Sequence, residues 1–381
     1  MKLFTLLFPI WIISTLPALV VPVAVASQIP KESDKTIKIG LLIQDNKSVQ
    51  ARYGAEMAIR KANEKGGING RSLQLVTRSM EGPWGTGSKQ TVDLIFKEGV
   101  CAILGSHDGR NAHLAEQVAA KAQVVFLSAW ASDPTLSQAF VPWFFNCVPN
   151  DIQQAVPLID EIYSNRRITK IAAVTDNGYD SKQALKSFLK KTKKAGKPDP
   201  LQFTYDNSIN DFNDLLDQIT KADVTGIILF GQPGGSIKFI QQMRKRKMNL
   251  QVFGSLSLLG EDEHSDYDLK KFEDVVLVSY ANCLTSDELA FQNEFLKIFN
   301  QRPHTTAAYA FDGMNLIIES IKKDGTAREA VQKALKGIHY KGVTGSIQFD
   351  DRGNRIGAAG LIEIKNGLPV AVGQQTGSIF P

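Results

Sequence analysis

Two polar turns hold the side chains best suited to bind a small polar molecule, and each turn directly follows a short apolar run. They cover residues 105–111 (Gly-Ser-His-Asp-Gly-Arg-Asn) and 128–134 (Ser-Ala-Trp-Ala-Ser-Asp-Pro). The first turn leads into an apolar stripe with helical spacing at 112–122, and the unpaired N–H groups of such a helix start favour an anion. A second interpretation is that Asp108 or Asn111 only caps this helix.

The sequence does not indicate catalysis or a cofactor. Among five histidines, only His107 lies on a turn predicted to face this edge, and Ser106 and Asp108 are its immediate neighbours. Adjacent residues cannot converge on one point as a catalytic triad. The glycine-rich turns have neither the GxGxxG nor the GxxxxGK[ST] spacing of nucleotide sites. Without a CxxC pair or Cys/His ligand spacing, no metal and no cofactor are expected, and the chain is not predicted to be an enzyme.

The elements that would position the turns alternate between strand and helix. Apolar strands are predicted at 36–43, 73–76, 100–104 and 124–127, with amphipathic helices between them. This order predicts a doubly wound parallel sheet, in which both turns lie at the carboxyl edge, where ligands bind in open α/β sheets.

A second α/β domain of the same kind is predicted after residues 143–149. Its expected helices and strands, in chain order, cover 155–162, 170–174, a helix reaching 194, 201–205, 212–219, 226–230, a helix reaching 245, 250–253 and 275–280. Helices at 288–299 and 307–322 would then pack on the first domain, and strands at 344–349 and 360–364 would close the chain. The fold class is therefore α/β with two lobes.

Composition is that of an ordinary globular protein and argues against a nucleic-acid partner. The 381 residues are 43% hydrophobic and 22% charged, with a formal net charge of +5. The densest basic runs, 190–194 and 244–247, fall at predicted helix ends, where cations complement the helix dipole. No aromatic residues interleave with these charges, as they would in a nucleic-acid surface.

Residues 1–26 are predicted to be a secretory signal peptide. Lys2 precedes a long apolar run, and Ala24-Val25-Ala26 gives a small-x-small cleavage pattern before Ser27. An uncleaved membrane anchor is the alternative, because the run is long enough to span a bilayer. Three prolines and the cleavage pattern favour removal, and no cysteine is placed for a lipoprotein anchor. We therefore expect the protein in the periplasm or another extracytoplasmic compartment.

Several short motifs, taken in order, give the chain a family resemblance. They are Gly54-Ala55-Glu56-Met57-Ala58, residues 63–70 (Asn-Glu-Lys-Gly-Gly-Ile-Asn-Gly), Ala102-Ile103-Leu104-Gly105, the stretch from Leu127-Ser128 to Asp133-Pro134, Asp176-Asn177-Gly178-Tyr179, residues 308–313 and residues 345–350. Through them the chain, over about residues 36–370, resembles extracytoplasmic solute-binding proteins of the leucine/isoleucine/valine-binding family, with the periplasmic-binding-protein type I fold.

The resemblance implies two lobes joined by three hinge crossings, with a ligand between the lobes. The crossings would lie near 147–150, 280–285 and 353–357. Lobe one would comprise 36–148 plus 284–353, and lobe two would comprise 149–283 plus 354–381.

Cys147 and Cys283 would each lie at a crossing, so a disulfide between them is conceivable, but spacing alone does not establish it. Cys101 lies in an apolar strand and is interpreted as a buried hydrophobic residue.

The resemblance also suggests ligand-binding residues. By position, Gly109, Trp130 and Ser132 would hold a ligand carboxylate, although Gly109 offers only its N–H. Arg110 could pair with that carboxylate or lie in solvent. The remaining candidates are Tyr179, which would close over the ligand, Gln232, and the aromatic residue Trp84.

One departure from the family pattern bears on the ligand. The acid that would receive a ligand ammonium should fall near 254–257 (Gly-Ser-Leu-Ser), where there is none, although Glu261 or Asp262 could substitute. An ammonium without a carboxylate partner would be poorly stabilised. The expected ligand is therefore a small amino acid or an aromatic or aliphatic carboxylate.

The function predicted from these residues is solute capture for an ABC importer of the branched-chain amino acid type. A monomer would trap the ligand by hinge closure, and a permease in the inner membrane would bind the closed form. The alternative is a ligand-sensing subunit that passes the same closure to a signalling receptor.

Overall fold

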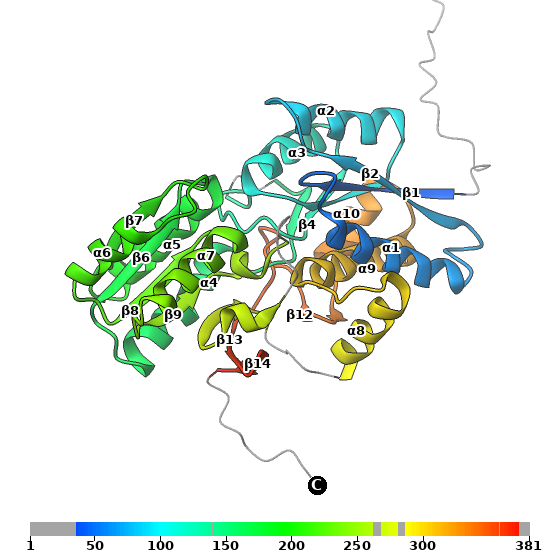
Figure 1. The fold of residues 1–381 in the computed structure, drawn as a ribbon. Coiled ribbons are helices and arrows are strands. Elements are labelled where there is room, and N and C mark those ends of the chain that lie inside the picture. Colours follow the sequence, from blue (N-terminus) through cyan, green and yellow to red (C-terminus); the bar gives the residue numbers. More distant parts are fainter. Residues whose placement is uncertain (1–35, 139–140, 262–267, 281–285, 358, 373–381) are drawn as a thin grey trace, which may run out of the picture. The chain divides into compact units, whose positions relative to one another are not determined.

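The computed structural model describes residues 36–138, 141–261, 268–280, 286–357 and 359–372 (Figure 1). The predicted signal peptide, Asp262 and Cys283 lie outside these ranges. Among the described residues, no helix is both long enough and apolar enough to cross a membrane.

The first sheet has five parallel strands in the order β2-β1-β3-β4-β5. The strands are β1 (Thr36–Ile43), β2 (Ser72–Ser79), β3 (Ala102–Ser106), β4 (Val125–Ser128) and β5 (Phe144–Asn146). Side chains alternate between its two faces. Leu41 belongs to the core with α1 (Val49–Glu64) and α9 (Thr305–Asp324), and Leu42 to the core with η1 (Asp93–Lys97) and α3 (Gly109–Lys121). Helices on both faces confirm the doubly wound prediction.

The helices of this sheet are α1 (Val49–Glu64), α2 (Thr86–Val92) with the π-helical turn η1 (Asp93–Lys97), α3 (Gly109–Lys121), α8 (Ser286–Phe299), α9 (Thr305–Asp324) and α10 (Arg328–Lys336). Helices α1 and α9 lie side by side (Figure 1) and make extensive contact. Their backbones approach closely at Gly54, where an added Cβ would lie 2.2 Å from the carbonyl oxygen of Ala307.

The second sheet has seven strands in the order β14-β13-β10-β9-β8-β6-β7. They are β6 (Ile171–Asp176), β7 (Leu201–Tyr205), β8 (Gly226–Phe230), β9 (Gln251–Gly254), β10 (Val275–Ser279), β13 (Gly360–Lys365) and β14 (Leu368–Ala371). The strands from β7 to β10 are parallel, whereas β13 and β14 add an antiparallel edge.

Helices and turns of the second sheet are α4 (Asp151–Ile159) with η2 (Asp160–Asn165), α5 (Tyr179–Lys194), α6 (Asn213–Lys221), α7 (Pro233–Lys245), η3 (Leu256–Leu259) and η4 (Leu269–Phe272).

The final predicted strand pair is only partly correct. The segment predicted at 344–349 is a short hairpin, β11 (Tyr340–Gly342) with β12 (Gly345–Ile347), apart from both main sheets. Buried Asp312 in α9 fixes this hairpin, because its carboxylate accepts the N–H groups of Val343 and Thr344 and the hydroxyl of Thr344 at 2.6–3.0 Å. Thus the segment is tied to α9 by hydrogen bonds and is not part of a larger sheet.

The strand predicted at 100–104 lies two residues further along, because β3 runs from Ala102 through Gly105 and Ser106. Gly105 thus lies in the strand and not in the predicted turn, and Phe126 leaves no room for a side chain there: an added Cβ would lie 2.4 Å from that ring.

The chain passes from the first sheet to the second after β5, returns after β10 and passes again between β12 and β13. Two of these crossings are joined by hydrogen bonds. The Asn146 N–H donates to the Gly353 carbonyl (2.8 Å), and the Arg355 N–H donates to the Asn146 carbonyl (3.0 Å). The Asn150 amide also donates to the Asn354 side-chain oxygen (3.2 Å). The lobes are therefore linked by a paired double strand.

Candidate functional site

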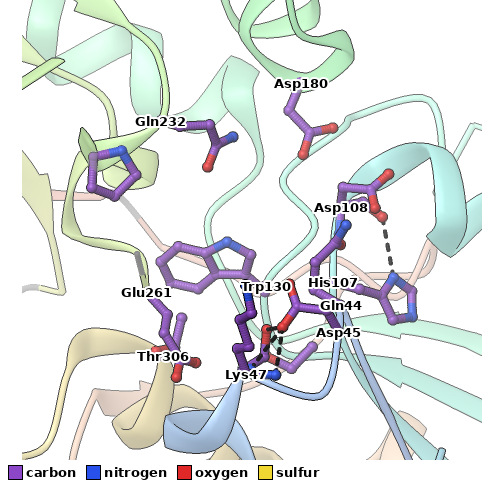
Figure 2. Close-up of a pocket in the computed structure, with 13 residues that line it drawn as sticks. Gln44, Asp45, Lys47, His107, Asp108, Trp130, Asp180, Gln232, Glu261 and Thr306 are labelled. Carbon is purple, nitrogen blue, oxygen red and sulfur yellow. Dashed lines mark hydrogen bonds between the residues drawn. The ribbon is translucent and has the colours of Figure 1, made fainter. Parts of the chain in front are cut away.

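A cavity of about 450 Å³ lies where loops from the carboxyl ends of both sheets meet (Figure 2). Its lining comes from the segments that follow β1, β3 and β4 in the first sheet and β6, β8 and β9 in the second, with one residue from α9. These segments include the last residue of β3 and the first turns of α5 and α7. The lining residues are Gln44, Asp45, Lys47, Ser48, Ser106, His107, Asp108, Trp130, Asp180, Gln232, Pro233, Glu261 and Thr306. The location matches the expected binding edge of α/β sheets.

Trp130 contributes the aromatic surface of this cavity. Figure 2 shows its indole between Gln232 on one side and Lys47 on the other. The indole packs edge-on against the buried ring of Tyr309, with ring centroids 6.4 Å apart. Held in this way, it presents a fixed aromatic face to an occupant of the cavity.

The start of α3 follows both sequence interpretations. Asp108 caps the helix, because its carboxylate accepts the N–H of Asn111 at 3.0 Å. The N–H of Gly109, also in the first turn of α3, donates to the carboxylate of Asp180 in α5 at 3.0 Å. A Cβ at Gly109 would lie 2.9 Å from the same Asp180 oxygen. The absence of a side chain at Gly109 therefore makes room for the carboxylate.

The surroundings of Asp180 destabilise a negative charge on its carboxyl group. Burial, followed by the negative charges of Asp108, Asp133 and Asp176, raises its pKa to about 7, although the Gly109 N–H opposes this shift. Near neutral pH, this carboxyl group is divided between its charged and neutral forms.

Glu261 makes a similar contact at the start of α1. Its carboxylate accepts the N–H of Gln50 at 2.9 Å. Burial raises its pKa to about 7, the charge of Asp45 adds to the rise, and the backbone donors oppose it. Two carboxylates of the second sheet thus lie on two helix starts of the first.

A third contact between the two halves joins Tyr179 to Asp133. The Tyr179 hydroxyl donates to the buried Asp133 carboxylate at 2.8 Å. His113 Nε2 lies 3.2 Å from the same oxygen, and Thr135 donates its N–H and hydroxyl to the other oxygen. Burial alone would raise the pKa of Asp133, but these hydrogen bonds together lower it to about 2.

His107 lines the cavity without free access to solvent. Its ring is stacked on Phe126, with centroids 5.9 Å apart, and its Nδ1 lies 3.1 Å from the Asp108 carbonyl oxygen. Burial lowers its pKa, so the ring is neutral at pH 7.

The cavity brings together two of the residues proposed from the sequence, Trp130 and Gln232. Gly109 and Tyr179 lie beside it, where each makes a contact between the halves. Ser132 is directed elsewhere: its carbonyl oxygen accepts the N–H of Asp151 at 2.8 Å. The position of Ser132 therefore indicates a role in holding the start of α4.

Arg110 and Trp84 lie outside the cavity lining. Trp84 is 74% exposed. The guanidinium carbon of Arg110 lies 6.0 Å from the Trp84 ring centroid and 5.4 Å from that of Tyr179, in cation–π positions. In this arrangement Arg110 contacts aromatic rings instead of contributing a positive charge to the cavity.

Sequence reasoning named Asp108 and Glu261 but missed the two other acids of the lining, Asp45 and Asp180. Asp45 could have been found, because it lies two residues after the strand predicted at 36–43, at the same edge as the two turns analysed. Asp180 directly follows the motif at 176–179, and Thr306 directly precedes the helix predicted at 307–322, but their place at the cavity depends on how the lobes meet. Among the described residues, no group of three or more His, Cys, Asp or Glu side chains is arranged to hold a metal ion.

Cys147 is buried, and its thiol donates to the Ser128 carbonyl at 3.1 Å. Because Cys283 is not among the described residues, the disulfide between the two stays a prediction.

Comparison with known proteins gives consistent matches over nearly the same span. The family described as "Periplasmic binding protein" matches residues 36–367. The Leu/Ile/Val-binding protein homolog 1 of Brucella abortus is 22% identical, over 84% of this chain and 88% of its own length. A chemotactic signal transduction system substrate-binding protein of Halobacterium salinarum is 24% identical, over 87% and 78%.

Solved structures show the same fold. The substrate-binding protein LivJ of Streptococcus pneumoniae, in complex with isoleucine, superposes with a TM-score of 0.79 at 22% identity, covering 88% of this chain and 98% of its own. A solute-binding protein of an ABC transporter from R. palustris, in complex with benzoate, gives a TM-score of 0.77 at 19% identity, covering 89% and 96%.

Proposed function

Because the chain belongs to the periplasmic binding protein family, we propose that it captures a small solute for an ABC importer of the branched-chain amino acid type. The observation that carries this proposal is the cavity, which is lined from the carboxyl edges of two separate sheets. A solute placed there touches both halves at once and so favours the closed arrangement over an open one.

The proposal includes the bounds of the two lobes. We assign 36–148 plus 284–353 to lobe one and 149–283 plus 354–381 to lobe two, as expected from the sequence. The contacts that Tyr179, Asp180 and Glu261 make with lobe one would form on closure. The partner would be a permease in the inner membrane, which recognises the closed form of a monomer acting outside the cytoplasm.

The chemistry of the cavity supports binding over catalysis. The similar proteins are described as binding proteins, and two of the solved structures hold isoleucine and benzoate. Signalling is the second candidate function, because the Halobacterium relative is described as part of a chemotactic system. Both functions depend on the same closure of the lobes and differ in the partner that binds the closed form.

The test is a thermal-shift screen of amino acids, amines, aromatic acids and short fatty acids, since a solute that binds the folded form raises Tm. A hit should be lost in Trp130→Ala, while that variant without solute keeps a Tm close to that of the unsubstituted protein. If no solute raises Tm, or if Trp130→Ala binds the hit equally well, the proposal is wrong. Uptake of the labelled hit by cells with and without the gene then separates import from signalling.

A further inference from the structure

Three backbone N–H groups at helix starts around the cavity are bound to the protein's own carboxylates. The Gly109 N–H, where the family resemblance would put a ligand carboxylate, is bound to Asp180. In the first turn of α1, the Gln50 N–H is bound to Glu261 at 2.9 Å. At the start of α7, the Gln232 N–H is bound to Asp176 at 2.9 Å. A ligand carboxylate would have to displace one of these groups.

The charges that line the cavity are mostly negative. Asp45, Asp108, Asp180 and Glu261 contribute to its wall, and Lys47 is the one cationic side chain among the described lining residues. Arg110, which could have supplied a second positive charge, lies against aromatic rings outside the lining. In a partly buried site of low dielectric, this surplus of carboxylates attracts a cation and repels an anion.

The cavity also offers uncharged groups that suit a cation. The Thr306 side chain is 4% exposed, and its hydroxyl oxygen has no hydrogen-bond partner among the described residues. That oxygen can accept from an ammonium or guanidinium N–H. The indole of Trp130 provides the ring face over which cations bind best. Together with the acids, these groups form a site with many acceptors.

We infer that the solute carries a cationic group, an ammonium or a guanidinium, which binds at the acidic wall that includes Asp180 and Glu261, beside Trp130. This inference rests on the proposed function and names its ligand class. The sequence led us to expect a small amino acid or a carboxylate, with Glu261 as a possible partner for an ammonium. The inference keeps the cationic group and drops the carboxylate, because the Gly109 N–H is bound to Asp180. Among the described residues, Asp180 receives one hydrogen bond, from Gly109, so its carboxylate has acceptor positions left for a ligand.

Proton uptake and release give an independent prediction. Burial raises the pKa of both Asp180 and Glu261 to about 7, so each is partly protonated near neutral pH. A bound cation favours the charged carboxylates and lowers both pKa values. Binding at pH 7 should therefore release protons.

The experiment compares three solutes of one skeleton by calorimetry at pH 7: 3-methylbutylamine, leucine and 4-methylpentanoate. A second set, benzylamine and benzoate, varies the skeleton, and agmatine tests a guanidinium. We expect an amine or agmatine to bind at least tenfold more tightly than the matched carboxylate. The binding heat should also differ between phosphate and Tris buffers in the sense of proton release.

Two isosteric variants test the residues. Asp180→Asn and Glu261→Gln keep an oxygen that can accept from the backbone N–H groups, so the fold is retained, and each should weaken cation binding at least tenfold. Asp214→Asn, an exposed acid in α6, is the matched control and should bind the cation like the unsubstituted protein.

The outcomes separate this inference from the proposed function. If a carboxylate or neutral solute binds more tightly than every cation, and Trp130→Ala abolishes that binding, the ligand class is wrong and solute capture stands. If neither acid variant weakens cation binding relative to Asp214→Asn, the assignment of the cation to these acids is wrong. If the full screen finds no solute at all, the proposed function itself fails, and the inference fails with it.

Discussion

Removing one hydroxyl, in Tyr179→Phe, should shift the protein measurably toward the open form. The Tyr179 hydroxyl donates to the Asp133 carboxylate at 2.8 Å across the two lobes. A hydrogen bond to a charged group contributes about 1.5–3 kcal/mol. Asp133 keeps the bonds from Thr135 and His113, and Tyr179 is only half-buried, so the lower value applies. About 1.5 kcal/mol corresponds to roughly a tenfold fall in the ratio of closed to open molecules.

Electron–electron resonance between two spin labels would measure that ratio in the protein without added solute. The exposed residues Lys65 in lobe one and Lys221 in lobe two are suitable positions, labelled through ketone-bearing residues so that native thiols stay unmodified. The control is Tyr163→Phe, which removes a tyrosine hydroxyl that donates to the Pro198 carbonyl within lobe two. A distance distribution in Tyr179→Phe equal to that of the control would refute the reasoning.

Three further predictions concern pH, a buried acid and a helix contact. The pKa values of Asp180 and Glu261, about 7 in the closed structure, should fall on opening, so closure takes up protons. The fraction of closed molecules should therefore be largest below pH 4 and decline as the pH rises toward 7. A ratio of closed to open molecules that rises over this range, measured with the same spin labels, would contradict the prediction. Asp312→Ala leaves three buried donors of the β11–β12 hairpin without an acceptor. In urea titration, the free energy of unfolding should fall by about 3 kcal/mol or more. A loss below about 1 kcal/mol would argue against a role of Asp312 in holding the hairpin. Gly54→Ala puts a methyl group against the Ala307 carbonyl. The same titration should show a free energy of unfolding lower by about 1–3 kcal/mol. Unchanged stability would contradict this prediction.

The fold could be predicted from the sequence because its main elements are long and strongly patterned. Strand β1 was predicted with its observed ends, 36–43, and α9 within two residues at each end. The helix α10 and the edge strand β14 were not predicted. Strand β14 spans only four residues, and three of them are exposed. Periodicity gives a weak signal over so few residues.

The site could be predicted only in part. Trp130 and Gln232 were found because each follows a strand, and the carboxyl edge of a parallel sheet is readable from element order. Glu261 contacts the Gln50 N–H from 211 positions away, and no local pattern encodes such a meeting. The sequence did contain one clue to Asp180: the missing hydroxyl at Gly109 indicates that something else fills that space.

The two crossings that run side by side at Asn146 and Asn354 limit how the molecule can open. Because they are hydrogen-bonded to each other, neither can twist without carrying the other along, so sliding and independent swivelling of the lobes are suppressed. The remaining motion is rotation of one lobe relative to the other about an axis through the two paired crossings. A membrane partner would thus encounter a narrow range of conformations. These would differ mainly in the angle between the lobes, and that angle would distinguish the solute-bound form from the solute-free form.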